Sequence, residues 1–162
     1  MKSFTSSAVR RAQRALTLTC LLCLCLLAQT NVLTVAPSGR MPAKRNTTVT
    51  ATVHAQLREG YHANSNTPSE DYLIPLKLTW NAAPLEVVEV KYPEPKMEKY
   101  QFSAKPLSVF SGGFDITTKF SVPAKAPNGP AILTGKLRYQ ACTDKLCLPP
   151  KTIEVPLTVD IQ

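Results

Sequence analysis

TTVTATVHAQLR, residues 47 to 58, is the stretch that indicates the fold class, because apolar and polar residues alternate along it. An alternation with a period of two places each set of residues on one face of an extended strand. The stretch therefore predicts a β-strand with one buried and one solvated face. The apolar face carries Val49, Ala51, Val53, Ala55 and Leu57.

The same alternation recurs along the rest of the chain. It is found in LIPLKLTW (73–80), FDITTKFSV (114–122), ILTGKLRYQA (132–141) and KTIEVPLTVDI (151–161), with shorter candidates at 85–90 and 107–110. Turn signals separate these runs, and all 14 prolines fall after residue 30, which argues against a long helix there. Seven short strands predict an all-β protein, an immunoglobulin-like β-sandwich of seven or more strands.

Residues 1–30 have the pattern of a signal peptide. Four basic residues precede an apolar run from Ala15 to Ala28, and a run of this length suits a signal better than a transmembrane helix, which needs ~20 apolar residues. We expect cleavage near residues 28–31 and a periplasmic or secreted protein. An uncleaved signal would instead anchor the protein to the membrane.

Residues 31–46 mix Pro, Gly, Ser and basic residues without periodicity and are predicted to form a flexible leader before a single domain at 47–162. Without the signal, 15 basic and 11 acidic residues remain, a net charge of +4. The basic residues are scattered singly, which is not the pattern of a nucleic-acid interface. We therefore expect no nucleic-acid partner.

Only two of the five cysteines lie outside the predicted signal. They are Cys142 and Cys147 in YQACTDKLCLPP, residues 139–150. Export would bring them to an oxidising compartment, where disulfides persist. If residues 131–142 and 151–161 are neighbouring antiparallel strands, the two cysteines flank a four-residue turn. Their Cα atoms would then be ~4.5 Å apart, within reach of a disulfide bond.

Such a disulfide is either a structural staple or a redox switch. A ring of about six residues contributes only ~2 kcal/mol on the chain-entropy model, against ~4.7 kcal/mol for a 100-residue loop. Cys142 also falls on the polar side of its strand, so we expect it to point away from the core and to be reachable by another protein's thiol. These features favour the switch. The alternative is an immunoglobulin-like binding or chaperone-like module with an inert disulfide.

The cysteine stretch and the KTIEVPL that follows it resemble the active-site hairpin of the N-terminal periplasmic domain of the thiol:disulfide interchange protein DsbD family. In that hairpin a Tyr-Gln-X-Cys run leads to a second Cys and then to Pro-Pro. REGYHANSNTPSEDYLIPLKLTW, residues 58–80, is similar to the family's Gly-aromatic-His stretch before a Trp-ended strand. The resemblance spans residues 47–160.

The resemblance implies an immunoglobulin-like fold and a protein thiol:disulfide oxidoreductase without a cofactor, with Cys142 and Cys147 as the redox pair. It implies electron transfer from a membrane-embedded thiol reductase to oxidised periplasmic acceptors of the thioredoxin-like or disulfide-isomerase kind, and a role in cytochrome c biogenesis. An aromatic cap over the pair would lie in residues 97–110, with Tyr100 and Phe102 as candidates. We expect a monomer that receives its electrons from a separate protein.

Other chemistry has weaker support in the sequence. Asp144 and Lys145, between the cysteines, are candidate modulators of the thiol pKa values. The two histidines, His54 and His62, do not predict a metal site, because His54 lies mid-strand on a polar face. No hydrolase motif is present, and Trp80 is expected to be a core residue.

Overall fold

The computed structural model describes residues 31–162, so the predicted signal peptide lies outside the described residues. Their secondary structure consists of strands, and no helix among them is long and apolar enough to cross a membrane. The strands are β1 (Leu33–Pro37), β2 (Met41–Ala43), β3 (Thr48–Leu57), β4 (His62–Asn64), β5 (Lys77–Asn81), β6 (Glu86–Lys91), β7 (Lys96–Glu98), β8 (Leu107–Ser111), β9 (Gly113–Ser121), β10 (Gly129–Tyr139), β11 (Ala141–Cys142) and β12 (Lys151–Ile161).

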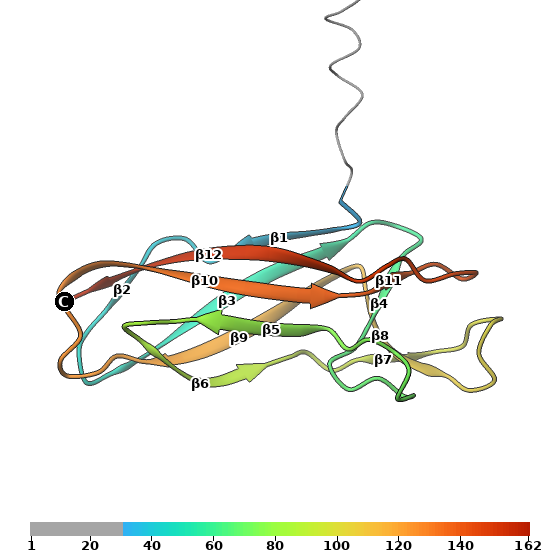
Figure 1. Ribbon diagram of the computed structural model, residues 1–162, viewed down its shortest axis with the longest axis horizontal. Helices are drawn as coiled ribbons and strands as arrows, with labels where there is room; N and C mark the ends of the chain where they lie inside the picture. Colours follow the sequence, from blue (N-terminus) through green and yellow to red (C-terminus); the bar gives the residue numbers. More distant parts are fainter. Residues whose placement is uncertain (1–30) are drawn as a thin grey trace, which may run out of the picture. The chain divides into compact units, whose positions relative to one another are not determined.

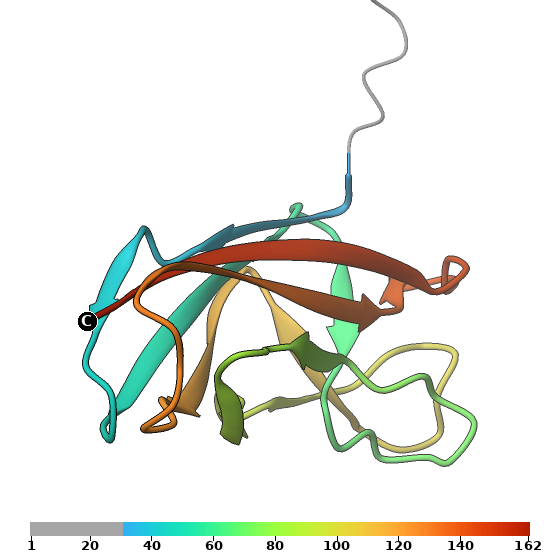
Figure 2. The same ribbon diagram turned by 60° about the vertical axis from the view of Figure 1, so that its left-hand side comes forward.

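Two four-stranded sheets form an immunoglobulin-like β-sandwich, which confirms the predicted fold class (Figures 1 and 2). One sheet has the order β1-β3-β9-β6 and the other β2-β12-β10-β5. All seven strands predicted from periodicity are present, as β3, β5, β6, β8, β9, β10 and β12. Four of the five unpredicted strands have two or three residues, too few for an alternation to be recognised, and the fifth, β1, falls in the segment predicted as a flexible leader.

The core lies between the two sheets and consists of the apolar faces that the alternation predicts. Val53 and Ile116 from one sheet and Leu137 and Val155 from the other are at most 1% exposed. Trp80 on β5 packs against the two larger of the three clusters of buried residues, which confirms its expected core position. Its Nε1 donates a hydrogen bond of 2.9 Å to Thr118 Oγ1 on the opposite sheet.

The prediction of a flexible leader at residues 31–46 is wrong. β1 pairs antiparallel with β3, and β2 pairs parallel with β12, so this segment supplies one edge strand to each sheet. Leu33 has no exposed surface. An edge strand is held by backbone hydrogen bonds to one neighbour and tolerates proline, so Pro37 and Pro42 do not prevent pairing. The compact unit therefore begins at Val32.

A third sheet, β11-β4-β8-β7, lies at the end of the sandwich away from the C-terminus (Figure 1). The chain reaches it by leaving β10 after Tyr139 and re-forming pairs as β11, whose Ala141 and Cys142 lie opposite Ala63 and His62 of β4. The cysteine hairpin extends from β11 at this end of the molecule.

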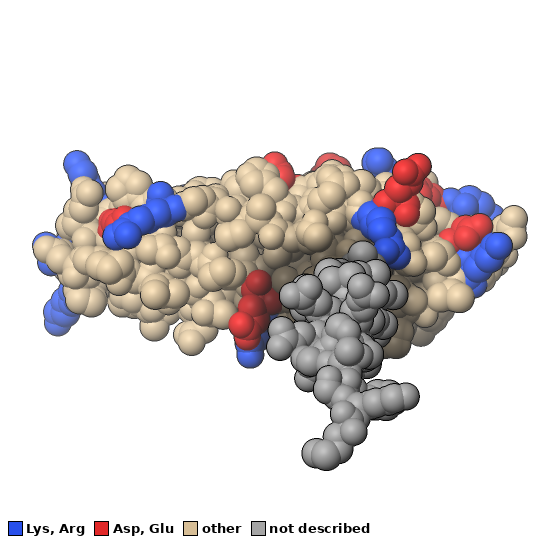
Figure 3. All heavy atoms as spheres, turned by 90° about the horizontal axis from the view of Figure 1, so that it is seen from above, with Lys and Arg blue, Asp and Glu red and all other residues tan. Residues whose placement is uncertain are grey.

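Charged side chains are dispersed over the surface. On the face seen in Figure 3, lysines and arginines lie singly or beside acidic side chains. Arg40 in the loop before β2 and Asp160 on β12 form an ion pair. This arrangement matches the scattered basic residues of the sequence.

Candidate redox site

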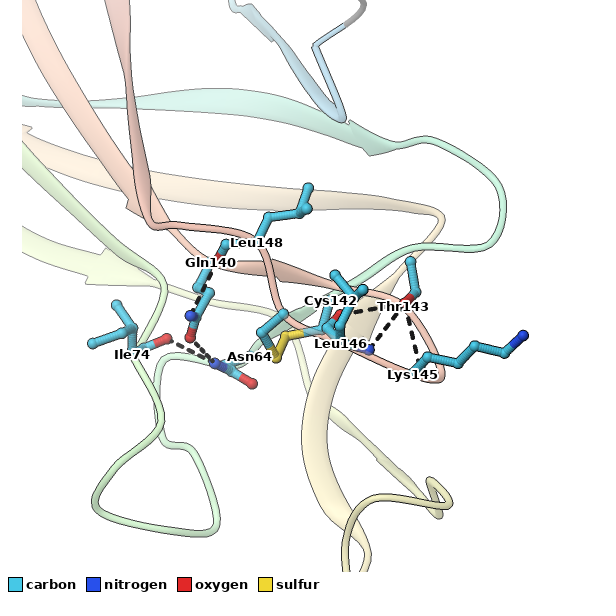
Figure 4. Close-up of a disulfide and its surroundings, with 9 residues drawn as sticks. Asn64, Ile74, Gln140, Cys142, Thr143, Lys145, Leu146 and Leu148 are labelled. Carbon is cyan, nitrogen blue, oxygen red and sulfur yellow. Dashed lines mark hydrogen bonds between the residues drawn. A yellow bond between two sulfur atoms is a disulfide. The ribbon is translucent and has the colours of Figure 1, made fainter.

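Cys142 and Cys147 are joined by a disulfide, with Cα atoms 3.9 Å apart (Figure 4). Hydrogen bonds within the hairpin shape the turn between them. The Thr143 backbone nitrogen donates to the Leu146 carbonyl oxygen at 2.8 Å, and the Leu148 nitrogen donates to the Ala141 carbonyl oxygen at 2.8 Å. The disulfide therefore joins two arms of a hairpin that backbone hydrogen bonds also hold together.

The two cysteines differ in exposure. Cys142 is only 1% exposed, whereas Cys147 is exposed. The prediction that Cys142 is reachable by another thiol is therefore wrong, although its expected direction is right. Ala141 belongs to the core cluster, and successive side chains of a strand point to opposite faces, so Cys142 faces away from the core. That second face is also buried at Cys142, where His62 of the neighbouring β4 lies opposite it and is itself 4% exposed.

A chain of side-chain hydrogen bonds fastens the base of the hairpin (Figure 4). Asn64 on β4 donates through Nδ2 to the Ile74 carbonyl oxygen at 3.1 Å and to Gln140 Oε1 at 3.3 Å. Gln140 donates through Nε2 to the Leu148 carbonyl oxygen at 3.1 Å. Asn64 and Gln140 thus tie both arms of the hairpin to β4, a role that the sequence analysis did not predict.

His62 lies directly opposite Cys142 in the β4–β11 pair. Side chains of opposed residues in an antiparallel pair lie on the same face, with Cβ atoms ~4.5–5.5 Å apart. His62 is 4% exposed, and its Nε2 is buried without a hydrogen-bond partner. Burial lowers the pKa of His62, and the nearby Glu98 carboxylate partly opposes that shift. The ring next to the disulfide is therefore neutral at neutral pH.

The two predicted cap aromatics lie at different depths. Tyr100 stacks on His62 with ring centroids 4.0 Å apart, and its hydroxyl donates to Glu98 Oε2 at 2.6 Å. Burial and this contact raise the pKa of Tyr100. Phe102 stacks on Tyr100 at 5.5 Å and is 43% exposed. The structure thus brings Tyr100 over the histidine beside Cys142, with Phe102 one ring further out. Shielding of the disulfide by these rings stays a prediction.

Asp144 and Lys145, the predicted pKa modulators, are exposed on the turn. Asp144 lines a small hollow together with His62, Tyr100 and Glu98. A larger hollow lies on β1, β3 and β9 around His54 and Asp115, and no residue of the cysteine hairpin lines it. Within residues 31–162, no three His, Cys, Asp or Glu side chains are grouped as metal ligands would be.

Sequence reasoning weighed His62 only as a metal ligand and did not place it beside the cysteines. The available signal was its place in the Gly-aromatic-His run of residues 60–62. His62, Ala63 and Asn64 form a three-residue strand that is buried on both faces, so no alternation marks it. Only the pairing of β4 with β11 brings it to the disulfide.

Comparison with known proteins gives a consistent result. A family model described as "Thiol:disulfide interchange protein DsbD, N-terminal" matches residues 29–158. The structure is similar to the N-terminal periplasmic domain of ScsB from Proteus mirabilis, with a TM-score of 0.55 and 13% identity. That similarity covers 83% of this chain and 48% of the other, so the chain spans about half the length of that structure. It supports the shared fold.

Other solved structures are less similar. The Vibrio cholerae VesB protease has a TM-score of 0.39 at 11% identity, covering 81% of this chain and 32% of that one. The periplasmic chaperone SfaE has a TM-score of 0.35 at 11% identity, covering 80% and 57%. Neither score supports a conclusion. No curated protein matches the chain. The family match covers most of the chain and includes the disulfide hairpin, and the chain belongs to the family of the N-terminal domain of thiol:disulfide interchange protein DsbD.

Proposed function

We propose that the protein relays electrons through its Cys142–Cys147 disulfide, from a membrane-embedded thiol reductase to oxidised acceptor proteins of the thioredoxin-like or disulfide-isomerase kind. The observation that carries the proposal is a disulfide between one exposed and one buried cysteine, in a hairpin of a DsbD-family domain. Its compartment would be the periplasm, as for the ScsB domain. A role in cytochrome c biogenesis would follow from the acceptors it serves.

The difference in exposure supports a different role for each sulfur in the proposed relay. A donor thiolate attacks the exposed Cys147 Sγ, the Cys142–Cys147 bond breaks, and Cys142 leaves with the electron pair. A second donor thiol then resolves the mixed disulfide and releases reduced Cys147. In the onward step the Cys147 thiolate attacks an acceptor disulfide. Cys142 then attacks Cys147, which re-forms the internal disulfide and releases the reduced acceptor. Two electrons pass in each cycle, and no cofactor is required.

The competing function is a binding or chaperone-like module with an inert disulfide. Equilibration of the protein in glutathione or dithiothreitol buffers, with alkylation of free thiols and mass measurement, separates the two. A midpoint between roughly −180 and −270 mV, the range of known exchange proteins, is expected. A midpoint below about −300 mV, typical of structural disulfides, would contradict the relay.

Trapping tests the partners themselves. Cys142→Ser leaves Cys147 without its resolving thiol, so mixed disulfides with acceptors should accumulate on exposure to periplasmic extract. Cys147→Ser is the matched control and should trap at least about tenfold less, because Cys142 is buried. Mass spectrometry of the trapped species identifies the acceptors. Equal trapping by both variants would contradict the assignment of Cys147 as the attacked sulfur.

A further inference from the structure

The environment of Cys142 raises a chemical problem that the relay does not solve by itself. Cys142 is 1% exposed, and burial disfavours the thiolate form. Yet Cys142 must leave as a thiolate when the disulfide opens and must attack as a thiolate when it closes. A group that exchanges a proton with this sulfur would remove the difficulty.

The position of His62 and its unpartnered Nε2 atom suit that exchange. It faces Cys142 across the β4–β11 pair, and its Nε2 is buried without a hydrogen-bond partner. A buried imidazole nitrogen without a partner is unusual, since most buried polar atoms are hydrogen-bonded. The stacked ring of Tyr100 holds the imidazole in place. This inference rests on the proposed relay. We propose that His62 exchanges a proton with Cys142 whenever the disulfide opens or closes, and so assists the reaction through that cysteine.

The proton balance is the same in both directions. On closing, His62 Nε2 accepts the proton of the Cys142 thiol. The resulting thiolate attacks Cys147 in the mixed disulfide, and the acceptor leaves as a thiolate that takes up a proton. On opening, the imidazolium returns a proton to the departing Cys142 thiolate. After closing, the imidazolium releases its proton to solvent and returns to the neutral form, and it takes up a proton from solvent again when the disulfide next opens.

Burial lowers the pKa of His62, and the Glu98 carboxylate opposes this shift and would stabilise a transient imidazolium. Glu98 acts on the pKa of His62 in the raising direction, and it accepts hydrogen bonds from Tyr100 through Oε2 and from Ser111 through Oε1. The groups that face His62 or its immediate neighbours are Cys142 on β11, Glu98 on β7, Tyr100 in the segment after β7, Asp144 on the turn, Tyr61 before β4, and Lys96, whose Nζ donates to Ser111 Oγ at 3.3 Å.

The test measures closing of the disulfide as a function of pH. Reduced protein is mixed with glutathione disulfide, and the mixed disulfide on Cys147 and the closed form are followed by quenched-flow mass spectrometry between about pH 5 and 9, which brackets the ordinary pKa values of His and Cys. His62→Phe keeps a flat ring to stack on Tyr100 but cannot carry a proton. His62→Gln keeps a polar group and likewise cannot. His54→Gln, on the exposed face of β3, is the matched control.

In both His62 variants the disulfide should close at least about tenfold more slowly at pH 7. This factor is below the rate enhancement that a positioned proton acceptor typically contributes. Their closing rate should rise with pH up to the ionisation of the Cys142 thiol, whereas the wild-type rate levels off at lower pH. The first attack by Cys147 should keep its rate in all variants. Wild-type rates and pH profile in either folded His62 variant would overturn the inference and leave the relay intact. Failure of the wild-type protein to exchange with glutathione would instead refute the relay.

Discussion

At the scale of single residues, Cys142 and Cys147 share one bond but have different surroundings. Cys147 is exposed at the end of the turn, while Cys142 is buried opposite His62 of β4. The asymmetry suits a sulfur that is attacked and a sulfur that resolves. Geometry at the turn alone would have allowed the opposite assignment, so burial is what distinguishes the two.

The first prediction concerns the pH dependence of stability through His62. Its pKa is lowered in the folded protein from the ordinary 6.5, because burial disfavours the imidazolium. Below pH 6.5 the unfolded chain therefore binds a proton that the folded protein does not yet bind. The contribution to stability is intact above the unfolded pKa and is lost as the pH falls towards the folded pKa. We expect His62→Phe to have a flatter decline in the free energy of unfolding from about pH 7 to 5.

Urea denaturation at several pH values measures this slope. Ile132→Ala, at an exposed side chain that does not titrate, should decline as the wild-type protein does. A His62→Phe protein with the wild-type slope would show that the imidazole does not resist protonation in the fold.

At the scale of elements, β5 and β10 show how one glycine accommodates a large aromatic ring. Gly135 lies opposite Trp80, and a Cβ atom at Gly135 would be 3.0 Å from Trp80 Cζ3. The ring is in turn fixed by its hydrogen bond to Thr118 and by an edge-to-face contact with Phe120. The absence of a side chain at residue 135 is therefore what lets Trp80 lie across the core.

Gly135→Ala should destabilise the domain by ~1–3 kcal/mol, the usual cost of overpacking a core. The change is measured as a shift in the urea midpoint at constant m-value. Gly39→Ala is a suitable control, because nothing lies within 4 Å of a Cβ atom there. Equal stability of Gly135→Ala and Gly39→Ala would mean that Trp80 moves aside without cost.

The first strand of the domain is a second element with a measurable contribution. Leu33 on β1 has no exposed surface and lies opposite Leu57. Leu33→Ala should cost ~2–5 kcal/mol, because it leaves a cavity in the core. Ile132→Ala, at a side chain that is 73% exposed, should change stability by less than about 0.5 kcal/mol. Thermal and urea unfolding would compare the stability of the two variants. If Leu33→Ala left the stability unchanged, β1 would not contribute to the core, as the prediction of a flexible leader implied.

At the scale of the whole molecule, the disulfide lies at one end of the sandwich, and Ala141 at the base of its hairpin packs in the main core. The central strands of the two sandwich sheets are β3 and β9 in one and β12 and β10 in the other, whereas the disulfide belongs to the third sheet at one end (Figure 1). A reversible disulfide requires a fold that survives its opening. Hydrogen bonds through Asn64 and Gln140 hold the base of the hairpin independently of the sulfurs.

Reduction should therefore leave the domain folded. The six-residue ring contributes about 2 kcal/mol on the chain-entropy model, a fraction of the 5–15 kcal/mol typical of a domain. We expect an unchanged far-ultraviolet circular dichroism spectrum in excess reductant and a lower melting temperature. Asn64→Ala should make the reduced form more sensitive to protease at the hairpin, while the exposed Asn128→Ala should not. Global unfolding on reduction at 25 °C would show that the fold depends on the disulfide.

The sequence alone was sufficient for the all-β class, the seven longer strands and the cysteine pair, because these depend on alternation and spacing along the chain. Short strands escaped it, since β1, β2, β4, β7 and β11 are held by their neighbours and not by their own pattern. Tertiary structure alone decided that Cys142 is buried and Cys147 is exposed. It also placed His62 opposite Cys142 and stacked Tyr100 on His62, because pairing of β4 with β11 joins segments about 80 residues apart.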